Sequence, residues 1–183
     1  MCNRAFWAAA LLVMGCLAGF AAEAGDHGER HRHREGHHER ELEDAVPAPD
    51  NALYIATCGA CHMVYPPGLL NAASWSALLR GSGDHFGEML GLEDTDAALL
   101  DTYLRSQAAE ATQGELAGDI ARDLGARVVS RITEIPEIRK EHRKLPAAVV
   151  ARKSIGRLSN CIACHRRADG GVFDDDSVSI PSE

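Results

Sequence analysis

The stretch that decides the fold reads Cys58-Gly59-Ala60-Cys61-His62, and its pattern returns as Cys161-Ile162-Ala163-Cys164-His165. The spacing Cys-x-x-Cys-His is the attachment signal for c-type haem. Two thiols three residues apart can add to the two vinyl groups on one edge of a porphyrin, and the following histidine then binds the iron from one face. The two motifs therefore predict two haem c groups, with His62 and His165 as the proximal ligands.

The N-terminus predicts export from the cytoplasm. Arg4 gives a short positive region, residues 5–22 are apolar apart from glycine and Cys16, and Ala22-Glu23-Ala24 fits a small-x-small cleavage site. These features predict a signal peptide over residues 1–24 and a periplasmic protein. The alternative is lipoprotein processing at Cys16, although the lipobox before it is imperfect and the residues after it remain apolar. Nothing later in the chain is long and apolar enough to span a bilayer.

Cysteine pairs at this spacing also occur in zinc sites, redox dithiols and disulfides. A redox dithiol needs no following histidine, and a zinc pair is usually completed by other Cys or His at zinc spacing. Cleavage near residue 24 removes Cys2 and Cys16, so the two motifs use every cysteine of the mature chain. Haem attachment therefore explains the cysteines and leaves none for a disulfide in an oxidising compartment.

The mature chain begins with a histidine-rich leader over residues 25–44. Its histidines stand among Arg, Glu and Gly, so it has nothing to pack into a core and is predicted to be disordered. Val46-Pro47-Ala48-Pro49 then favours an extended linker, and leader and linker together cover residues 25–49. Histidine-rich tracts also bind divalent cations, and the sequence leaves open whether this leader binds metal or is only solvated.

The rest of the chain predicts an all-α fold in two haem domains, 50–118 and 119–183. No stretch shows sustained alternation of apolar and polar residues. Aromatic residues make up only 5% of the chain, so two large apolar haem groups would complete a small core. The predicted helices run from Asp50 or Asn51 to the first motif, from Ser74 to Gly81, over 94–110 from a cap at Asp94 or Thr95, from Pro136 to His142, and from Pro146 towards Gly156.

The longest predicted helix carries an apolar stripe at helical spacing, formed by Leu99, Leu100, Tyr103 and Leu104. Residues three and four apart share one face of a helix. We therefore expect the stripe to face the core, against a haem group or another helix.

Each iron also needs a sixth ligand or keeps an open position. Outside the leader and the motifs, the mature chain offers four candidates: His85, His142, Met63 and Met89. Met63 directly follows His62 and therefore lies on the wrong side of its own haem group. No His or Met follows His165, so the second iron must take its ligand from upstream, and His142 is the prediction.

For the first iron, His85 competes with Met89. His85 lies in Gly83-Asp84-His85-Phe86-Gly87, where glycine allows the backbone to approach a porphyrin closely. Asp84 or a backbone carbonyl could orient the other ring nitrogen. Met89 could equally fill space in a core. Residue types and spacing leave this choice open.

The sequence resembles the small dihaem cytochromes c that donate electrons to a high-spin, oxygen-binding monohaem cytochrome c. The resemblance covers most of residues 50–183 in the family's order, and the leader lies outside it. The matching stretches are 58–70, Ser74-Trp75, 84–88, 131–134, His142-Arg143 and 161–166.

This resemblance implies a first haem domain similar to class I cytochrome c and a smaller, irregular helical second domain. It also implies two histidines on each iron, His62 with His85 and His165 with His142. Met89 departs from the family, in which this stretch is usually polar, so a methionine ligand stays an alternative. The implied partners are redox proteins, namely the monohaem high-spin cytochrome c and a membrane-bound electron donor.

Two irons with both axial positions filled leave no site for substrate or oxygen, so the sequence predicts an electron carrier and not an enzyme. One alternative is a haem enzyme or gas sensor with one open iron. Another is a periplasmic protein that binds metal through its histidine-rich leader. A visible spectrum distinguishes the three.

Charge is distributed unevenly along the mature chain. Residues 45–121 carry ten acidic and two basic side chains, 122–167 carry twelve basic and four acidic, and 168–183 carry five acidic and no basic. This separation favours either steering of a charged partner or an ordinary solvated surface. The basic stretch has no interleaved aromatic residues, so nucleic acid is not predicted as a partner.

Overall fold

The computed structural model describes residues 45–183. The predicted signal peptide (1–24), the alternative lipidation site Cys16 and the histidine-rich leader (25–44) lie outside the described residues. Within that part of the chain the fold is all-α, as predicted, and contains helices but no strand. No helix there combines the length and apolar character needed to cross a membrane.

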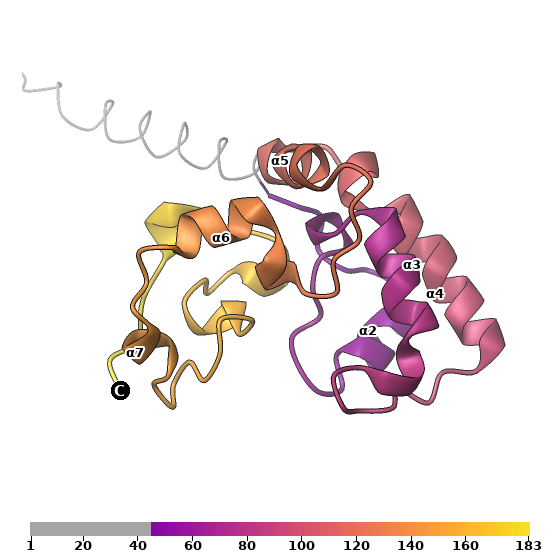
Figure 1. Ribbon diagram of the computed structural model, residues 1–183, viewed down its shortest axis with the longest axis horizontal. Coiled ribbons are helices and arrows are strands. Elements are labelled where there is room, and N and C mark those ends of the chain that lie inside the picture. Colours follow the sequence, from indigo (N-terminus) through magenta and orange to yellow (C-terminus); the bar gives the residue numbers. More distant parts are fainter. Residues whose placement is uncertain (1–44) are drawn as a thin grey trace, which may run out of the picture. The chain divides into compact units, whose positions relative to one another are not determined.

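Six α-helices and seven short 3-10 helices make up the described chain (Figure 1). The α-helices are α2 (Ala52–Cys58), α3 (Ala72–Arg80), α4 (Asp94–Ser106), α5 (Glu115–Leu124), α6 (Pro136–His142) and α7 (Ala147–Val150). The 3-10 helices are η1 (Pro67–Leu69), η2 (Ser82–Asp84), η3 (Ala109–Ala111), η4 (Ile132–Glu134), η5 (Cys161–Ala163), η6 (Ala168–Gly170) and η7 (Asp175–Ser177).

The first two helices begin at asparagine caps. Asn51 accepts the N–H of Tyr54 through its side chain at 3.0 Å, so α2 starts where the sequence predicts. The prediction that Ser74 caps α3 is wrong, because Asn71 accepts the N–H of Ser74 at 3.0 Å and starts the helix earlier. Gly81 ends α3, as predicted.

Helix α4 is the longest α-helix among the described residues and packs side by side with α3 (Figure 1). Its predicted cap is wrong, since Glu93 precedes the helix and makes no side-chain cap bond. Leu100 and Leu104 are buried as predicted, but Leu99 is 63% exposed. Leu99 is adjacent to Leu100 and therefore points about 100° away around the helix, outside the buried face.

Helix α5 is absent from the sequence prediction. It presents Ile120 and Leu124, four residues apart, to the core, and Gly125 follows at a φ of +51°. This apolar spacing and the following glycine were the available signals. The helix contacts α6, η1 and η3 and runs through position 118/119, where the sequence divides the two predicted domains. That division stays a prediction.

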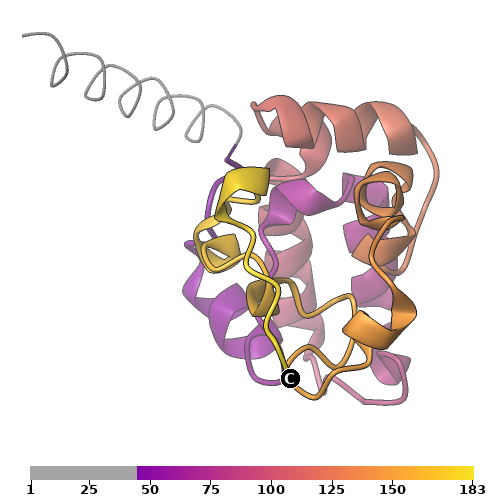
Figure 2. The same ribbon diagram turned by 90° about the vertical axis from the view of Figure 1, so that its left-hand side faces the viewer.

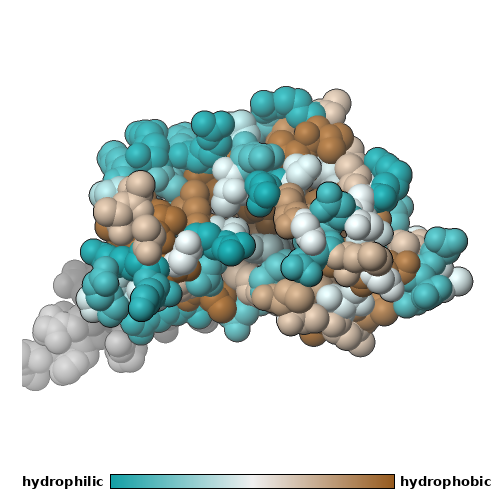
Figure 3. Space-filling model, turned by 60° about the horizontal axis from the view of Figure 1, so that its bottom comes forward, coloured by the Kyte–Doolittle hydropathy of each residue, from teal (hydrophilic) through white to brown (hydrophobic). Residues whose placement is uncertain are grey.

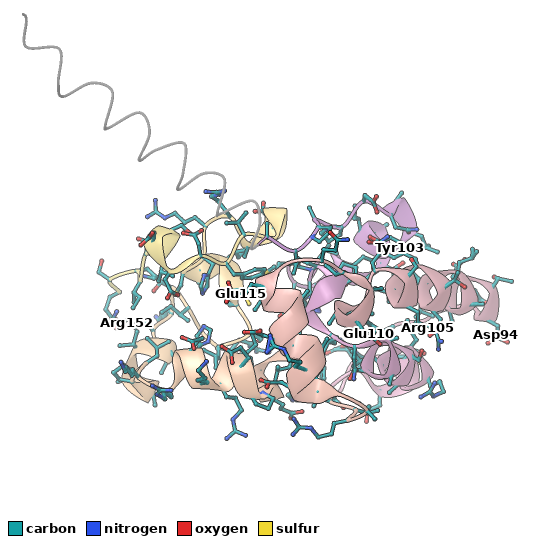
Figure 4. All side chains as sticks on the ribbon, turned by 90° about the horizontal axis from the view of Figure 1, so that it is seen from above. Asp94, Tyr103, Arg105, Glu110, Glu115 and Arg152 are labelled. Carbon is teal, nitrogen blue, oxygen red and sulfur yellow. The ribbon has the colours of Figure 1, made fainter. Side chains whose placement is uncertain are left out.

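One buried cluster joins the helices. The ring of Tyr54 meets that of Trp75 edge-on with centroids 6.1 Å apart, and the indole N–H of Trp75 donates to the carbonyl of Pro67 at 2.7 Å. Glu110, labelled in Figure 4, accepts the N–H of Ala72 at the start of α3. The apolar members of this cluster include Leu69, Leu70, Leu79, Leu100, Leu104, Ile120, Leu124 and Ile135.

The C-terminal segment is irregular but hydrogen-bonded to the second motif. The N–H of Ser179 donates to the carbonyl of Cys164 at 2.9 Å, and His165 pairs with Val178 in an isolated bridge. Figure 2 shows this C-terminal segment in yellow, ending at the C-terminus. Arg152, labelled in Figure 4, donates to the carbonyl of Pro181 at 2.9 Å. These bonds hold the tail beside the motif.

The predicted linker begins at a buried residue, and its extended form stays a prediction. Val46 is 1% exposed, and its N–H donates to the carbonyl of Gly171 at 3.0 Å. Gly171 has a φ of +81°, and a Cβ there would stand 1.8 Å from the carbonyl oxygen of Val46. Only glycine suits this contact, which joins the start of the described chain to its C-terminal region.

Candidate functional site

The structure brings His62 and His85 together. Their ring centroids lie 6.3 Å apart, with the ring planes at 31°. His62 follows the turn after α2, and His85 follows η2. Bonds from imidazole nitrogen to a metal are about 2 Å long, so two rings on one metal atom need centroids about 6 Å apart. The spacing of this pair therefore fits a single iron between the two rings.

A second pair of histidines, His142 and His165, lies in the C-terminal half. Their ring centroids are 6.0 Å apart, at an interplanar angle of 58°. His142 is the last residue of α6, and His165 closes the second motif. The ring of Phe173 stands 5.8 Å from that of His165, on the C-terminal segment. This spacing also fits one iron.

Two of the four rings are oriented by backbone carbonyls. Nδ1 of His62 lies 2.7 Å from the carbonyl oxygen of Met63, and Nδ1 of His142 lies 2.7 Å from that of Ile138. A ring that donates its Nδ1–H in this way presents its other nitrogen, Nε2, as a metal ligand. Both rings are therefore held in the tautomer that haem ligation requires.

His165 differs from these two rings. Its Nδ1 is buried and has no hydrogen-bond partner among the residues that the structure describes. A buried polar atom of this kind costs free energy when it is left without a hydrogen bond. Iron bound at Nε2 would leave Nδ1 as an unpaired N–H, so this ring lacks the second hydrogen bond that a ligand histidine usually makes.

Local electrostatics favour a neutral imidazole at one histidine of each pair, His85 and His165. Burial lowers the pKa of His85, and the neighbouring His62 and Arg131 lower it further. Burial also lowers the pKa of His165, as does His142, against a smaller opposite effect of nearby aspartates. A neutral imidazole has the free lone pair that a metal ligand needs.

Cys58 and Cys161, the first cysteine of each motif, are each partly buried. Burial raises the pKa of the Cys58 thiol to about 11 and that of Cys161 to about 11. Within residues 45–183, no three His, Cys, Asp or Glu side chains gather as a metal site.

A strained loop presents His85. Phe86, the next residue, has a φ of +59°, which is rare for a bulky side chain. Asp84 accepts the N–H of Gly87 at 2.8 Å and so braces the turn. The guanidinium of Arg131 lies 3.8 Å from the centroid of the Phe86 ring, a cation–π contact that holds the loop from outside.

Met89 stands apart from the histidine pair. Its side chain is 77% exposed, so the expectation that it fills a core is wrong. Of the two competing residues, His85 is the one that faces His62. The choice between them as iron ligand stays a prediction, and the geometry favours His85.

Large apolar side chains remain exposed around both motifs. Ile55 is one turn before Cys58, Phe86 follows His85, and Ile162 lies inside the second motif, and all three are more than 40% exposed. Figure 3 shows apolar areas of this kind, in brown, between polar side chains on one face. A porphyrin is a large apolar body that would cover such surface, so the exposed residues fit attached haem.

A family model described as dihaem cytochrome c matches residues 54–173. The chain belongs to the dihaem cytochrome c family. The two haem c groups predicted from the motifs are thereby confirmed as its cofactors, and the resemblance noted in the sequence is confirmed as well. It is a dihaem c-type cytochrome, a class associated with electron transport.

Two solved structures are similar to this cytochrome over most of their length. A dihaem cytochrome c from Shewanella baltica OS155 is 34% identical, covering 73% of this chain and 94% of that one, with a TM-score of 0.60. A dihaem cytochrome c from Rhodobacter sphaeroides is 32% identical, covering 69% of this chain and 99% of that one, with a TM-score of 0.61. No curated protein matches the chain.

Three side chains beside the histidines were not singled out from the sequence. Tyr65 places its ring 5.1 Å from that of His62, Phe173 packs against His165, and Arg131 covers Phe86. Tyr65 follows its histidine by three residues, which was the only local signal. The other two are brought to the sites by tertiary structure.

Proposed function

We propose that this cytochrome is a periplasmic electron carrier in which both irons are bound by two histidines. His62 and His85 would hold the first iron, and His165 and His142 the second. The observation that carries the proposal is the pair of ring separations, 6.3 Å and 6.0 Å. Each bound haem group supplies an iron that gains or loses one electron.

The chain's own residues attach, orient and enclose the two groups. Cys58 and Cys61 would hold the first through thioether bonds, and Cys161 and Cys164 the second. The carbonyls of residues 63 and 138 fix the tautomers of their histidines. Two filled axial positions leave no place for substrate or oxygen, so the protein moves electrons and is not an enzyme.

A visible and EPR spectrum of the purified holoprotein, oxidised and reduced, tests this proposal. We expect two low-spin haem groups that acid-acetone does not extract and that bind no carbon monoxide when reduced. An enzyme or gas sensor would instead show one high-spin iron that binds carbon monoxide. A stoichiometry of one, or extraction of either group, would contradict the double attachment.

The proposed location is the periplasm, after removal of a signal peptide over residues 1–24. Mass spectrometry of the mature chain should give an N-terminus near Gly25. A lipid-modified N-terminus at Cys16 would show membrane anchoring instead. The haem domains are proposed to span 50–118 and 119–183, after a leader and linker over 25–49.

The proposed partners are redox proteins, namely a monohaem high-spin cytochrome c as acceptor and a membrane-bound electron donor. The basic charge of residues 122–167 supports steering of an acidic partner surface. Rates of reduction of the monohaem cytochrome, measured against ionic strength, test this. A rate that salt leaves unchanged would exclude steering.

A further inference from the structure

Tyr65 joins two segments that are 94 positions apart in the sequence. Its hydroxyl donates to the carbonyl of Ser159 at 2.7 Å. Its ring also stands 5.1 Å from the ring of His62, in a tilted arrangement. One side chain thus contacts the first motif histidine and the backbone just ahead of the second motif.

The position of Tyr65 is fixed from several sides. Tyr54, in α2, donates its hydroxyl to the carbonyl of Tyr65 at 2.8 Å. The side chain of Tyr65 is half-buried. The carbonyl of Ser159 can only accept, so the Tyr65 hydroxyl is the donor in this hydrogen bond.

The accepting segment leads directly to the second attachment site. Ser159 precedes Cys161 by two residues, and the Cys161 sulfur lies 3.7 Å from the same Ser159 carbonyl. Asn160, between them, donates its side-chain amide to the carbonyl of Ile155 at 2.9 Å. The backbone that meets Tyr65 is therefore the backbone that carries the second haem group.

Residues near the two motifs also line one groove. A groove adjoins residues flanking the first motif and residues within or after the second: Pro49, Ile55, Met63, Val64, Ile162, Arg166 and Asp169. The two attachment segments thus lie side by side, and the hydrogen bond between Tyr65 and Ser159 crosses between them.

We propose that Tyr65 is a positioning residue that sets the spacing of the two haem groups and the rate of electron exchange between them. The contiguous route runs from His62 across the Tyr65 ring, through the hydrogen bond to Ser159, and along the backbone to Cys161. One electron leaves the reduced group and enters the oxidised one, no bond forms or breaks, and Tyr65 keeps its proton. This inference rests on the proposed ligation of the first iron by His62.

The test compares the holoprotein variants Tyr65→Phe and Tyr103→Phe. The first removes only the hydroxyl that meets Ser159. The second is a matched control, because it removes a tyrosine hydroxyl bonded to Asp50 at 3.1 Å, away from the second motif. Hydrogen exchange of the amides of residues 160–165, EPR of the fully oxidised protein, and electron redistribution after one-electron photoreduction are measured in both.

We expect Tyr65→Phe to speed amide exchange of residues 160–165 by about two- to tenfold, as loss of one hydrogen bond implies. The magnetic interaction between the ferric irons should change, and electron redistribution should slow. Tyr103→Phe should match wild type in all three. Tyr65→Leu, which also removes the ring beside His62, should slow redistribution further.

Unchanged exchange and redistribution in Tyr65→Phe would overturn the inference. So would an equal change in Tyr103→Phe, since it would show general loosening. The proposed function is judged separately, from the spin state of both irons in the wild type. Low-spin irons with no effect of Tyr65→Phe would keep the proposed function and reject the role of Tyr65.

Discussion

In the first haem-binding region the ring that donates to a backbone carbonyl is the motif histidine, His62, whereas in the second region it is the partner, His142. The remaining rings are held differently. His85 lies on a loop whose next residue, Phe86, has a φ of +59°, and His165 is partly buried, with an unpaired Nδ1. Each region therefore has one histidine ring that is hydrogen-bonded to the backbone and one that is not. In the first region the bonded ring belongs to the motif histidine, and in the second it belongs to the partner histidine.

This difference indicates which segment of each region can move most easily. In the first region the loop around His85 can move without disturbing the attachment motif. In the second region His142 ends a helix, while His165 depends on the C-terminal segment that packs against it. Changes in the loop should therefore alter only the first iron, and changes in the tail only the second.

Removing the partner histidines should have the largest effect. His142→Ala opens the second iron, because no other His or Met of the C-terminal segment can replace it. We expect that iron to become high-spin and to bind carbon monoxide, while the first stays low-spin. His85→Ala should give the reverse result. If both irons stay low-spin in His142→Ala without an added ligand, the assignment of His142 is wrong.

Gly171→Ala should destabilise the fold of the second region, although Gly171 is not a proposed iron ligand. The backbone there has a φ of +81°, and the new Cβ would meet the carbonyl oxygen of Val46 at 1.8 Å. Strain and the broken contact should cost about 3 kcal/mol of stability, with backbone strain of this kind worth about 1–3 kcal/mol alone. Denaturant unfolding, followed by the absorbance of the oxidised haem groups, measures it.

Gly118→Ala is the control for this change. Gly118 lies within α5, and a Cβ there meets nothing within 4 Å. Alanine should raise the stability by about 0.5–1 kcal/mol, because it favours the helix more than glycine. A loss of stability in Gly118→Ala equal to that in Gly171→Ala would show that the contact with Val46 is not the cause.

Arg131→Gln should loosen only the first region. The guanidinium of Arg131 lies 3.8 Å from the centroid of the Phe86 ring, and an exposed cation–π contact contributes about 0.5–1 kcal/mol. Its loss should let the His85 loop open more often, so cyanide should bind the first ferric iron about two- to fivefold faster. Stopped-flow absorbance measures this rate. Equal acceleration at the second iron would contradict a local clamp.

The sequence predicted those parts of the site that depend on local spacing. The two motifs have a fixed local spacing. His85 and His142 lie far from their motifs in the sequence, but they could still be inferred as ligands because the chain offers few other His or Met residues. Helix starts were less predictable. Asn71 and Ser74 can both cap a helix, and tertiary packing decides, since Ser74 is buried and accepts the N–H of Val129 at 3.0 Å.

Contacts between distant segments could not be inferred. The hydrogen bond from Tyr65 to Ser159 spans 94 positions of the sequence. The hydrogen bond from Val46 to Gly171 joins the start of the described chain to its C-terminal region. Neither has a periodic or motif signal, because each depends on how the helices pack. Helix α5 was missed for a related reason: its glycine weakens the local signal, and burial of its apolar face supplies the stability.

The smallest effect is expected from Met89→Leu, which bears on whether the two irons share one kind of ligation. Met89 is 77% exposed, whereas His85 faces His62 with ring centroids 6.3 Å apart. Leucine has a similar volume, and such exchanges usually cost less than about 1.5 kcal/mol even in a core. The oxidised spectrum should be unchanged and should lack, in wild type as well, the weak band near roughly 695 nm that marks methionine ligation. A band that disappears in Met89→Leu would make the first iron His/Met, and would raise its potential above that of the second, since methionine ligation raises the potential of a haem iron.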